Sequence, residues 1–158
     1  MTFTQFIQNY LNKRVDSGSF DGSYQCVDLV RVYAQKVWDI GTKAVGYSGG
    51  AKDMLRAGST FYDQDVNRIQ NTPNGIPPKG AIVVFDGSIW NKWGHTGVVV
   101  DADINRITIL EQNGGLGKGF GFSTDAVRYC KYKYTWNSFG VGKVLGWIVP
   151  KNGHLTNE

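Results

Sequence analysis

The stretch HTGVVVDADINRITILEQN, residues 95–113, carries a clear fold signal. Its two halves, 95–103 and 106–113, are rich in β-branched residues, and turn-forming residues lie between them. This pattern is typical of strands, and the two halves are close enough in sequence to pair as a hairpin. The stretch therefore predicts two antiparallel strands.

Similar short segments, rich in β-branched and aromatic residues, flank the hairpin at 81–87, 126–134 and 143–150. The chain before Pro73 instead shows helical periodicity. Helices followed by a run of antiparallel strands indicate the α+β fold class.

The N-terminal half predicts two helices. Apolar residues of the first helix recur at the spacing of one buried stripe, at Phe3, Phe6, Ile7, Tyr10 and Leu11. Thr2 and Gln5 fit a capping box that starts this helix. A second helix is expected from about Gln25 to Trp38, after a loop of glycine, serine and aspartate at 15–23.

A length of 158 residues suits one domain, and the sequence holds no internal repeat. We expect a single domain over residues 1–150. The residues 151–158, KNGHLTNE, predict a frayed polar tail or the stub of a linker.

The net charge of +4 favours an anionic partner such as nucleic acid, a phospholipid surface or a phosphate-bearing cell wall. The basic residues are scattered apart from a mild cluster at 128–134, which a solvated surface also explains. No apolar run approaches the roughly 20 residues of a membrane span. The first fifteen residues lack the basic start and apolar block of a signal peptide.

Cys26 lies at the expected first turn of the second helix, and Cys130 is the other cysteine. The positive end of the helix dipole and the unpaired N–H groups there favour a thiolate, which is the nucleophilic form. The same N–H groups can hold an oxyanion. A buried core residue, a metal ligand and a disulfide with Cys130 are the alternative roles.

A thiolate nucleophile needs a histidine base and an acceptor that orients the histidine. Of the two histidines, His154 lies in the polar tail, so His95 is the candidate base. Glu111 and Asn113 are two residues apart, on the same face of the neighbouring strand, and are the candidate orienting groups.

The hairpin register decides whether these groups meet. We expect His95 to pair with Asn113 and Val99 with Ile109, which places His95 and Glu111 on one face. A slip of one residue would send His95 to the opposite face.

The expected register needs an odd number of turn residues. We therefore predict a three-residue turn at 103–105, with Ala102 opposite Arg106 and a positive φ at Asn105. The common two-residue turn would give the wrong register in a regular ladder.

The blocks YQCVDLVRVYA, WGHTGVVVDAD, ILEQNGG and NTPNGIPPKGAIVVF resemble, in order, those of the CHAP family of cysteine- and histidine-dependent amidohydrolases/peptidases. The resemblance implies a papain-like fold, with N-terminal helices packed on an antiparallel sheet or partial barrel of about five to six strands. It further implies that Cys26 is the nucleophile and His95 the base. Glu111 would orient the imidazole with help from Asn113, and Gln25 would face the oxyanion.

The resemblance also raises the question of calcium. Many relatives carry an acidic calcium loop just before the nucleophile, and here that loop has altered spacing. Asp28 matches a ligand position, whereas Asp16 and Asp21 fit only with an insertion or deletion. Calcium is therefore a candidate structural ion, with ordinary aspartate turn chemistry as the alternative, and the chemistry itself needs no cofactor.

The function implied by the resemblance is cleavage of a peptidoglycan amide bond in a Gram-positive type wall. The enzyme would be an endolysin-like N-acetylmuramoyl-L-alanine amidase or endopeptidase, monomeric, and either alone or part of a longer lysin or virion protein. It would stay in the host cytoplasm until lysis or ride on a virion tail. The alternatives are a non-catalytic wall-binding module and a nucleic-acid-binding domain, for which no readout motif is present.

Overall fold

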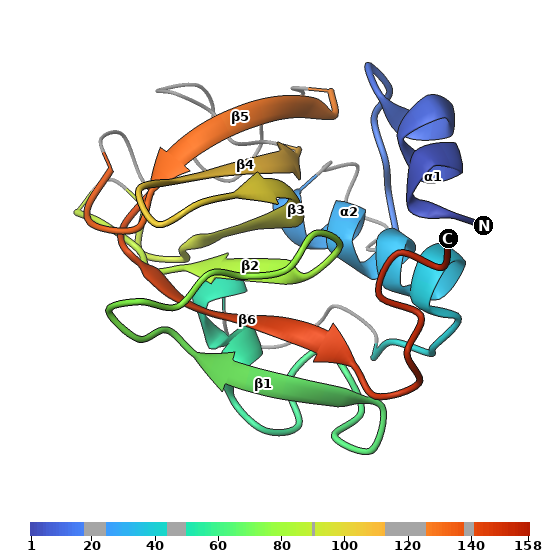
Figure 1. Cartoon of the computed structure of the whole chain (residues 1–158). Coiled ribbons are helices and arrows are strands. Elements are labelled where there is room, and N and C mark those ends of the chain that lie inside the picture. The colour runs from blue at the N-terminus through green and yellow to red at the C-terminus, as the bar shows by residue number, and fades with distance from the viewer. Residues whose placement is uncertain (18–24, 44–49, 90, 113–125, 138–140) are drawn as a thin grey trace.

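The computed structural model describes residues 1–17, 25–43, 50–89, 91–112, 126–137 and 141–158. Within these ranges a few helices pack on one six-stranded antiparallel sheet with the strand order β1-β6-β2-β3-β4-β5 (Figure 1). The strands are β1 (Val66–Gln70), β2 (Ile82–Phe85), β3 (His95–Ala102), β4 (Arg106–Glu111), β5 (Arg128–Lys133) and β6 (Val144–Pro150). The predicted α+β class is confirmed.

The helices are α1 (Phe3–Tyr10), α2 (Cys26–Tyr33), the π-helical turn η1 (Ala34–Trp38) and the 3₁₀ turn η2 (Ala51–Leu55). The predicted capping box of α1 is confirmed: the Gln5 N–H donates to the Thr2 hydroxyl over 3.1 Å, and the Thr2 N–H donates to the Gln5 side chain over 2.9 Å. The second predicted helix is confirmed as the continuous run of α2 and η1. No helix in the described ranges is long and apolar enough to cross a membrane.

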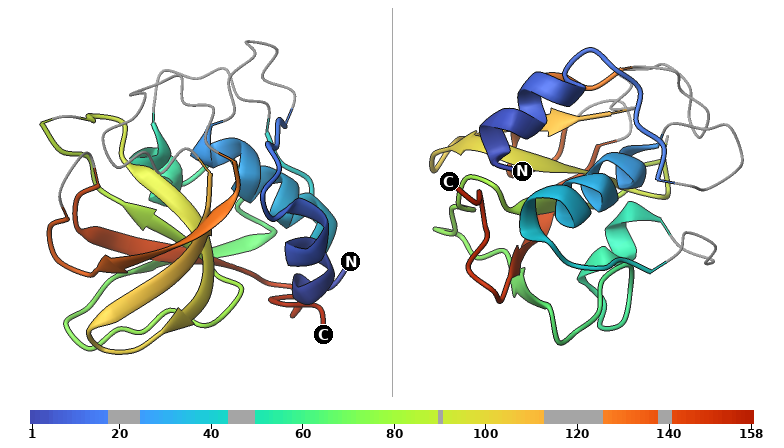
Figure 2. Two further views of the ribbon diagram at one scale, coloured as in Figure 1. Left: turned by 90° about the horizontal axis from the view of Figure 1, so that it is seen from above. Right: turned by 90° about the vertical axis from the view of Figure 1, so that its right-hand side faces the viewer.

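The sheet carries an apolar cluster on each face. Helices α1 and α2 lie on one side of the strongly twisted sheet, as both views in Figure 2 show. On that side Val98 and Leu110 pack with Phe6, Leu29 and Tyr33. Their sequence neighbours Val99 and Ile109 belong to the cluster on the other side. This alternation follows from the two-residue period of a strand.

Strand β1 is an element that the sequence pattern did not predict. It pairs with β6 at one edge of the sheet, from Val66 opposite Pro150 to Gln70 opposite Gly146. Only Val66 of its five residues is buried, so the segment has no apolar alternation to identify it.

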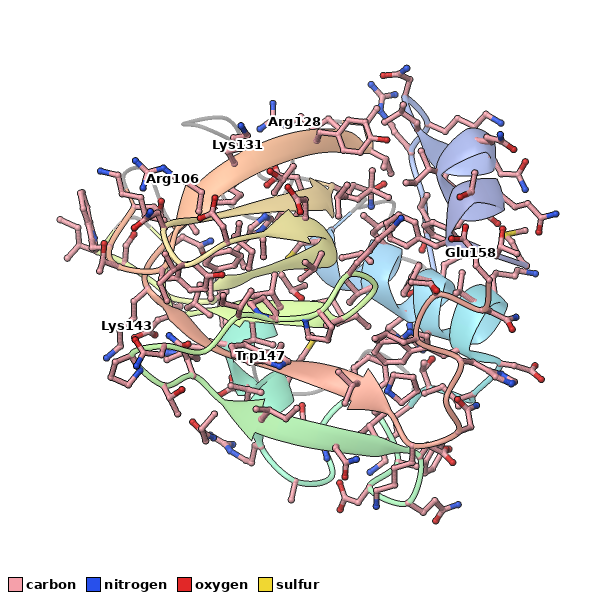
Figure 3. All side chains as sticks on the ribbon, in the orientation of Figure 1. Arg106, Arg128, Lys131, Lys143, Trp147 and Glu158 are labelled. Carbon is pink, nitrogen blue, oxygen red and sulfur yellow. The ribbon has the colours of Figure 1, made fainter. Side chains whose placement is uncertain are left out.

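The C-terminal residues are docked, so the expectation of a frayed tail is wrong. The Leu155 carbonyl accepts hydrogen bonds from the Tyr33 hydroxyl at 2.9 Å and from the Trp38 indole at 3.1 Å. Glu158 lies beside α1 in Figure 3 and accepts a hydrogen bond from the Thr4 N–H. The Leu155 contacts use a backbone carbonyl, which any residue carries, so the composition of the tail did not reveal them.

Candidate active site

Cys26 is the first residue of α2, as predicted. Gln25 precedes it in an extended conformation, with φ −88° and ψ 164°, and forms the N-cap. The Cys26 N–H is one of the first N–H groups of a helix, which have no acceptor within the helix. The thiol is free and half-buried. A partly accessible sulfur therefore lies at the positive end of the helix dipole.

His95 is the first residue of β3 and is only 2% exposed. Its Nε2 lies 3.1 Å from Glu111 Oε1, and its ring also interacts with the Cys26 side chain. Because Nε2 faces Glu111, Nδ1 is the ring nitrogen left for the thiol. The rings of Phe85 and Tyr132 hold the imidazole, with centroids 6.0 and 5.9 Å away.

Glu111 is the last residue of β4, and its side chain is fully buried. Oε1 accepts hydrogen bonds from His95 and from the Tyr132 hydroxyl, and Oε2 accepts one from Arg128 Nε at 3.2 Å. Burial alone would raise the pKa of Glu111, but these donors and the charges of His95 and Arg128 lower it below its usual value. Glu111 is therefore a carboxylate at neutral pH.

The electrostatics favour a protonated His95. Burial alone would lower the pKa of His95, but the hydrogen bonds to Cys26 and Glu111, together with their charges, raise it to about 10. Positive and negative groups then alternate from Arg128 through Glu111 to His95. The charged imidazole therefore lies next to the Cys26 side chain, which is the arrangement that a thiol nucleophile requires.

The register near the site is confirmed: Val98 pairs with Leu110 and Val99 with Ile109. Closer to the turn the register changes, because Asp101 pairs with Thr108 and the bulge leaves Val100 as the extra residue on β3. A bulge of this kind reverses which face the following residues occupy.

The predicted three-residue turn is wrong. Ala102 pairs with Ile107, and the Asp103 N–H donates to the Arg106 carbonyl at 2.9 Å, so the turn has two residues. The Asp103 side chain accepts hydrogen bonds from the Asn105 and Arg106 N–H groups. Asn105 is also not one of the described non-glycine residues with positive φ. The bulge reconciles the common turn with the register that the site requires.

Of the two other predicted site residues, the structure describes Gln25 but not Asn113. The Gln25 backbone lies directly before Cys26, and its N–H donates to Asp28 Oδ2 at 3.0 Å. Asn113 lies outside the described residues, so its pairing with His95 stays a prediction.

The predicted calcium loop lies only partly within the described residues, so calcium binding stays a prediction. Asp21 lies outside them, and no three His, Cys, Asp or Glu side chains gather into a metal-binding group within them. Asp28 is buried and accepts hydrogen bonds from the Ser17 hydroxyl and from the Gln25 N–H. The Arg31 guanidinium donates to the same Ser17 hydroxyl. Asp28 thus has a role in capping α2, and the prediction of calcium binding through Asp16, Asp21 and Asp28 rests on the resemblance alone.

The sequence analysis missed three polar residues of this region: Arg128, Tyr132 and Gln112. A signal for the first two existed, because Arg128 and Tyr132 are four apart and share one face of a strand. Arg128 pairs directly with Glu111 across β4 and β5. The sequence analysis predicted a strand at 126–134 and a basic cluster at 128–134, and it did not connect either with the site.

Cys130 differs from Cys26 in its surroundings. Both cysteines are free, so the alternative of a disulfide between them is wrong. Burial and the charge of Glu111 raise the pKa of the Cys130 thiol. Cys130 is therefore a poor nucleophile at neutral pH.

Comparisons with known proteins agree with this geometry. Residues 16–113 match the family described as "CHAP domain". The chain is 36% identical over 96 residues to the endolysin LysK of Staphylococcus phage K. The aligned region covers 59% of this chain and 18% of LysK.

Solved structures show the same fold. The chain matches the endolysin LysIME-EF1 with a TM-score of 0.64 and 18% identity, covering 94% of this chain and 62% of the other. It matches Ly7917 in complex with "the hydrolyzing product of MDP" with a TM-score of 0.60 and 20% identity, covering 95% and 63%. The chain thus spans about a fifth of LysK and less than two thirds of either solved chain. The predicted CHAP fold is confirmed.

Proposed function

Because this chain belongs to the CHAP domain family, we propose that it hydrolyses an amide bond of bacterial peptidoglycan through a thioester on Cys26. One observation carries the proposal: the half-buried Cys26 at the start of α2 interacts with a buried histidine whose Nε2 is held by Glu111. The likeness to the endolysin LysK supports peptidoglycan as the substrate.

In the first half of the proposed reaction, Cys26 Sγ attacks the carbonyl carbon of the scissile amide. The developing oxyanion accepts a hydrogen bond from the Cys26 N–H and, we propose, from Gln25. His95 then donates its proton to the leaving nitrogen, the C–N bond breaks, and a thioester remains on Cys26.

In the second half, His95 is neutral and accepts a proton from water, whose oxygen attacks the thioester carbonyl. The C–S bond breaks, a carboxylic acid product leaves, and the thiolate–imidazolium pair is restored. Glu111 keeps the imidazole in one orientation through both halves, and Asn113 is proposed to assist.

We propose that the substrate lies in walls of the Gram-positive type, whose anionic polymers suit the net charge of +4. The bond is proposed to be either the muramoyl–alanine amide or a peptide bond of the stem or cross-bridge. The proposed setting is a monomer, alone or within a longer lysin or virion protein, that reaches the wall at lysis or from the virion tail.

A product assay tests the reaction class. Digestion of purified Gram-positive walls should release free amino groups without new reducing sugars, because amide hydrolysis yields an amine and a carboxylate. Mass spectrometry of the soluble fragments then identifies the bond. New reducing ends without new amines would contradict the proposal, since they are the products of a glycosidase.

A further inference from the structure

Gln112 is a fully buried polar side chain that follows β4 directly. Its Oε1 accepts a hydrogen bond from the Val15 N–H at 2.6 Å. Its Nε2 donates to the Val15 carbonyl at 2.7 Å and to the Gln25 carbonyl at 2.9 Å. The amide therefore joins the end of β4 to two separate segments, one of which leads directly into the nucleophile.

The bond to Gln25 acts on the peptide group that contains the Cys26 N–H. The Gln25 carbonyl and the Cys26 N–H belong to one planar trans peptide and point in opposite directions. Fixing the direction of the carbonyl therefore fixes the direction of the N–H. The same carbonyl also accepts the Asp28 N–H at 3.1 Å, so two donors hold this peptide plane.

The two hydrogen bonds to Val15 hold the Gln112 side chain in one orientation. Gln112 binds both the N–H and the carbonyl of one buried residue, much as a neighbouring strand would. This bidentate contact restrains the Gln112 side chain, so that its remaining hydrogen bond has a defined direction.

Gln112 and its neighbour Glu111 serve different halves of the site. Glu111 binds His95, whereas Gln112 binds the backbone in front of Cys26. Two consecutive residues thus hold the base and the nucleophile segment against the same strand end.

We infer that Gln112 is a positioning residue that orients the Cys26 N–H for the oxyanion. The inference rests on the proposed function, in which Cys26 is the nucleophile. The hydrogen bonds of Gln112 go to backbone atoms of Val15 and Gln25 and not to the thiol. It acts through the Gln25–Cys26 peptide, on the step in which charge develops on the carbonyl oxygen.

Gln112→Met tests the inference because methionine keeps the length of the side chain and removes its hydrogen bonds. We expect kcat for wall hydrolysis to fall by roughly 10- to 100-fold, with KM little changed. Alkylation of Cys26 by iodoacetamide should keep its wild-type rate, because that displacement forms no oxyanion. A melting temperature (Tm) well above the assay temperature shows that the variant is folded during the assay.

Asn152→Leu is the matched control. The Asn152 amide donates to the Trp38 carbonyl at 2.7 Å, at the opposite end of the helical run that begins with Cys26. Its loss should lower Tm and leave both hydrolysis and alkylation per folded molecule unchanged.

Two results would overturn the inference: unchanged hydrolysis by Gln112→Met, or hydrolysis and alkylation that fall in parallel. The second result would mean that Gln112 supports the thiolate and not the oxyanion. If Gln112→Met does not fold, Gln112→Glu provides the test. Its neutral carboxylic acid both donates and accepts, so its activity relative to wild type should fall as pH rises, and a flat ratio would refute the role. An active Cys26→Ala variant would instead refute the proposed function itself.

Discussion

Cys26→Ala should lower the rate of wall hydrolysis by at least about 10⁴-fold, because the proposed covalent intermediate forms on the Cys26 sulfur. The side chain is half-buried at the first turn of α2, so its truncation should leave the fold intact. Wall clearing and release of amino groups measure the activity. Sedimentation with purified walls measures binding, which the variant should retain.

Cys130→Ala is the matched control, since Cys130 is also a free and half-buried cysteine. This variant should clear walls at the wild-type rate. Wild-type clearing by Cys26→Ala would remove Cys26 from the mechanism. A wild-type protein that sediments with walls and releases no amino groups would establish the alternative of a wall-binding module.

Glu111→Gln should lower kcat by about 10³- to 10⁴-fold, the size of effect seen when the acid that orients a catalytic histidine becomes an amide. Glutamine keeps the shape of the side chain but loses the negative charge that His95 and Arg128 face. The imidazolium is then less stable, and the preferred orientation of the ring is lost.

The pH dependence of kcat and Tm shows in which direction Glu111→Gln moves the pKa of His95. The pKa of His95 is raised to about 10, so the imidazolium stabilises the fold fully below the ordinary histidine value and this stabilisation is lost as pH rises through about 10. Removal of the Glu111 charge lowers that pKa. The alkaline limb of kcat against pH, and the alkaline loss of Tm, should therefore both move to lower pH in Glu111→Gln.

Glu158→Gln provides the control for these measurements. Glu158 binds Thr4 beside α1, on the C-terminal segment of the chain (Figure 3). Its kcat–pH profile should match that of the wild type. An unchanged alkaline limb in Glu111→Gln would show that Glu111 does not set the protonation of His95.

Several features that depend on residues close together in the sequence were predicted correctly. The capping box of α1 depends on Thr2 and Gln5 alone, and both predicted bonds are present. The second helix and the hairpin strands also follow from short-range periodicity. Strand β1 and the docked tail were missed because edge pairing and backbone hydrogen bonds leave no hydrophobic pattern.

The hairpin shows how a correct functional constraint can lead to a wrong local prediction. The need to place His95 beside Glu111 fixed the register near the site, and Val99 does pair with Ile109. The sequence pattern could not distinguish a longer turn from a bulge, and the structure uses the bulge at Val100. The longer turn and the bulge each leave one extra residue without a partner, and each therefore gives the register that the site requires.

The candidate site was predictable only in part. Cys26, His95 and Glu111 follow from residue types, spacing and the resemblance. Arg128 and Gln112 depend on contacts between segments that are far apart in sequence, such as β5 with β4 and Gln25 with the end of β4. The shared strand face of Arg128 and Tyr132 was a signal in the sequence, but their contact with Glu111 depends on the strand order. The contact of Gln112 with Gln25 depends on the position of α2.

Alkylation of the wild-type protein measures the reactivity of Cys26 and the activity in one sample, so it tests whether Cys26 is the nucleophile. The protein is treated with iodoacetamide at neutral pH, and peptide mass spectrometry quantifies modification of Cys26 and Cys130 while wall clearing is followed. The charge of Glu111 and burial raise the pKa of Cys130, whereas Cys26 lies against the His95 imidazolium. Cys26 should be modified at least about 10-fold faster than Cys130, and activity should fall in proportion to that modification. Equal modification of both cysteines, or full activity after Cys26 is blocked, would contradict the account.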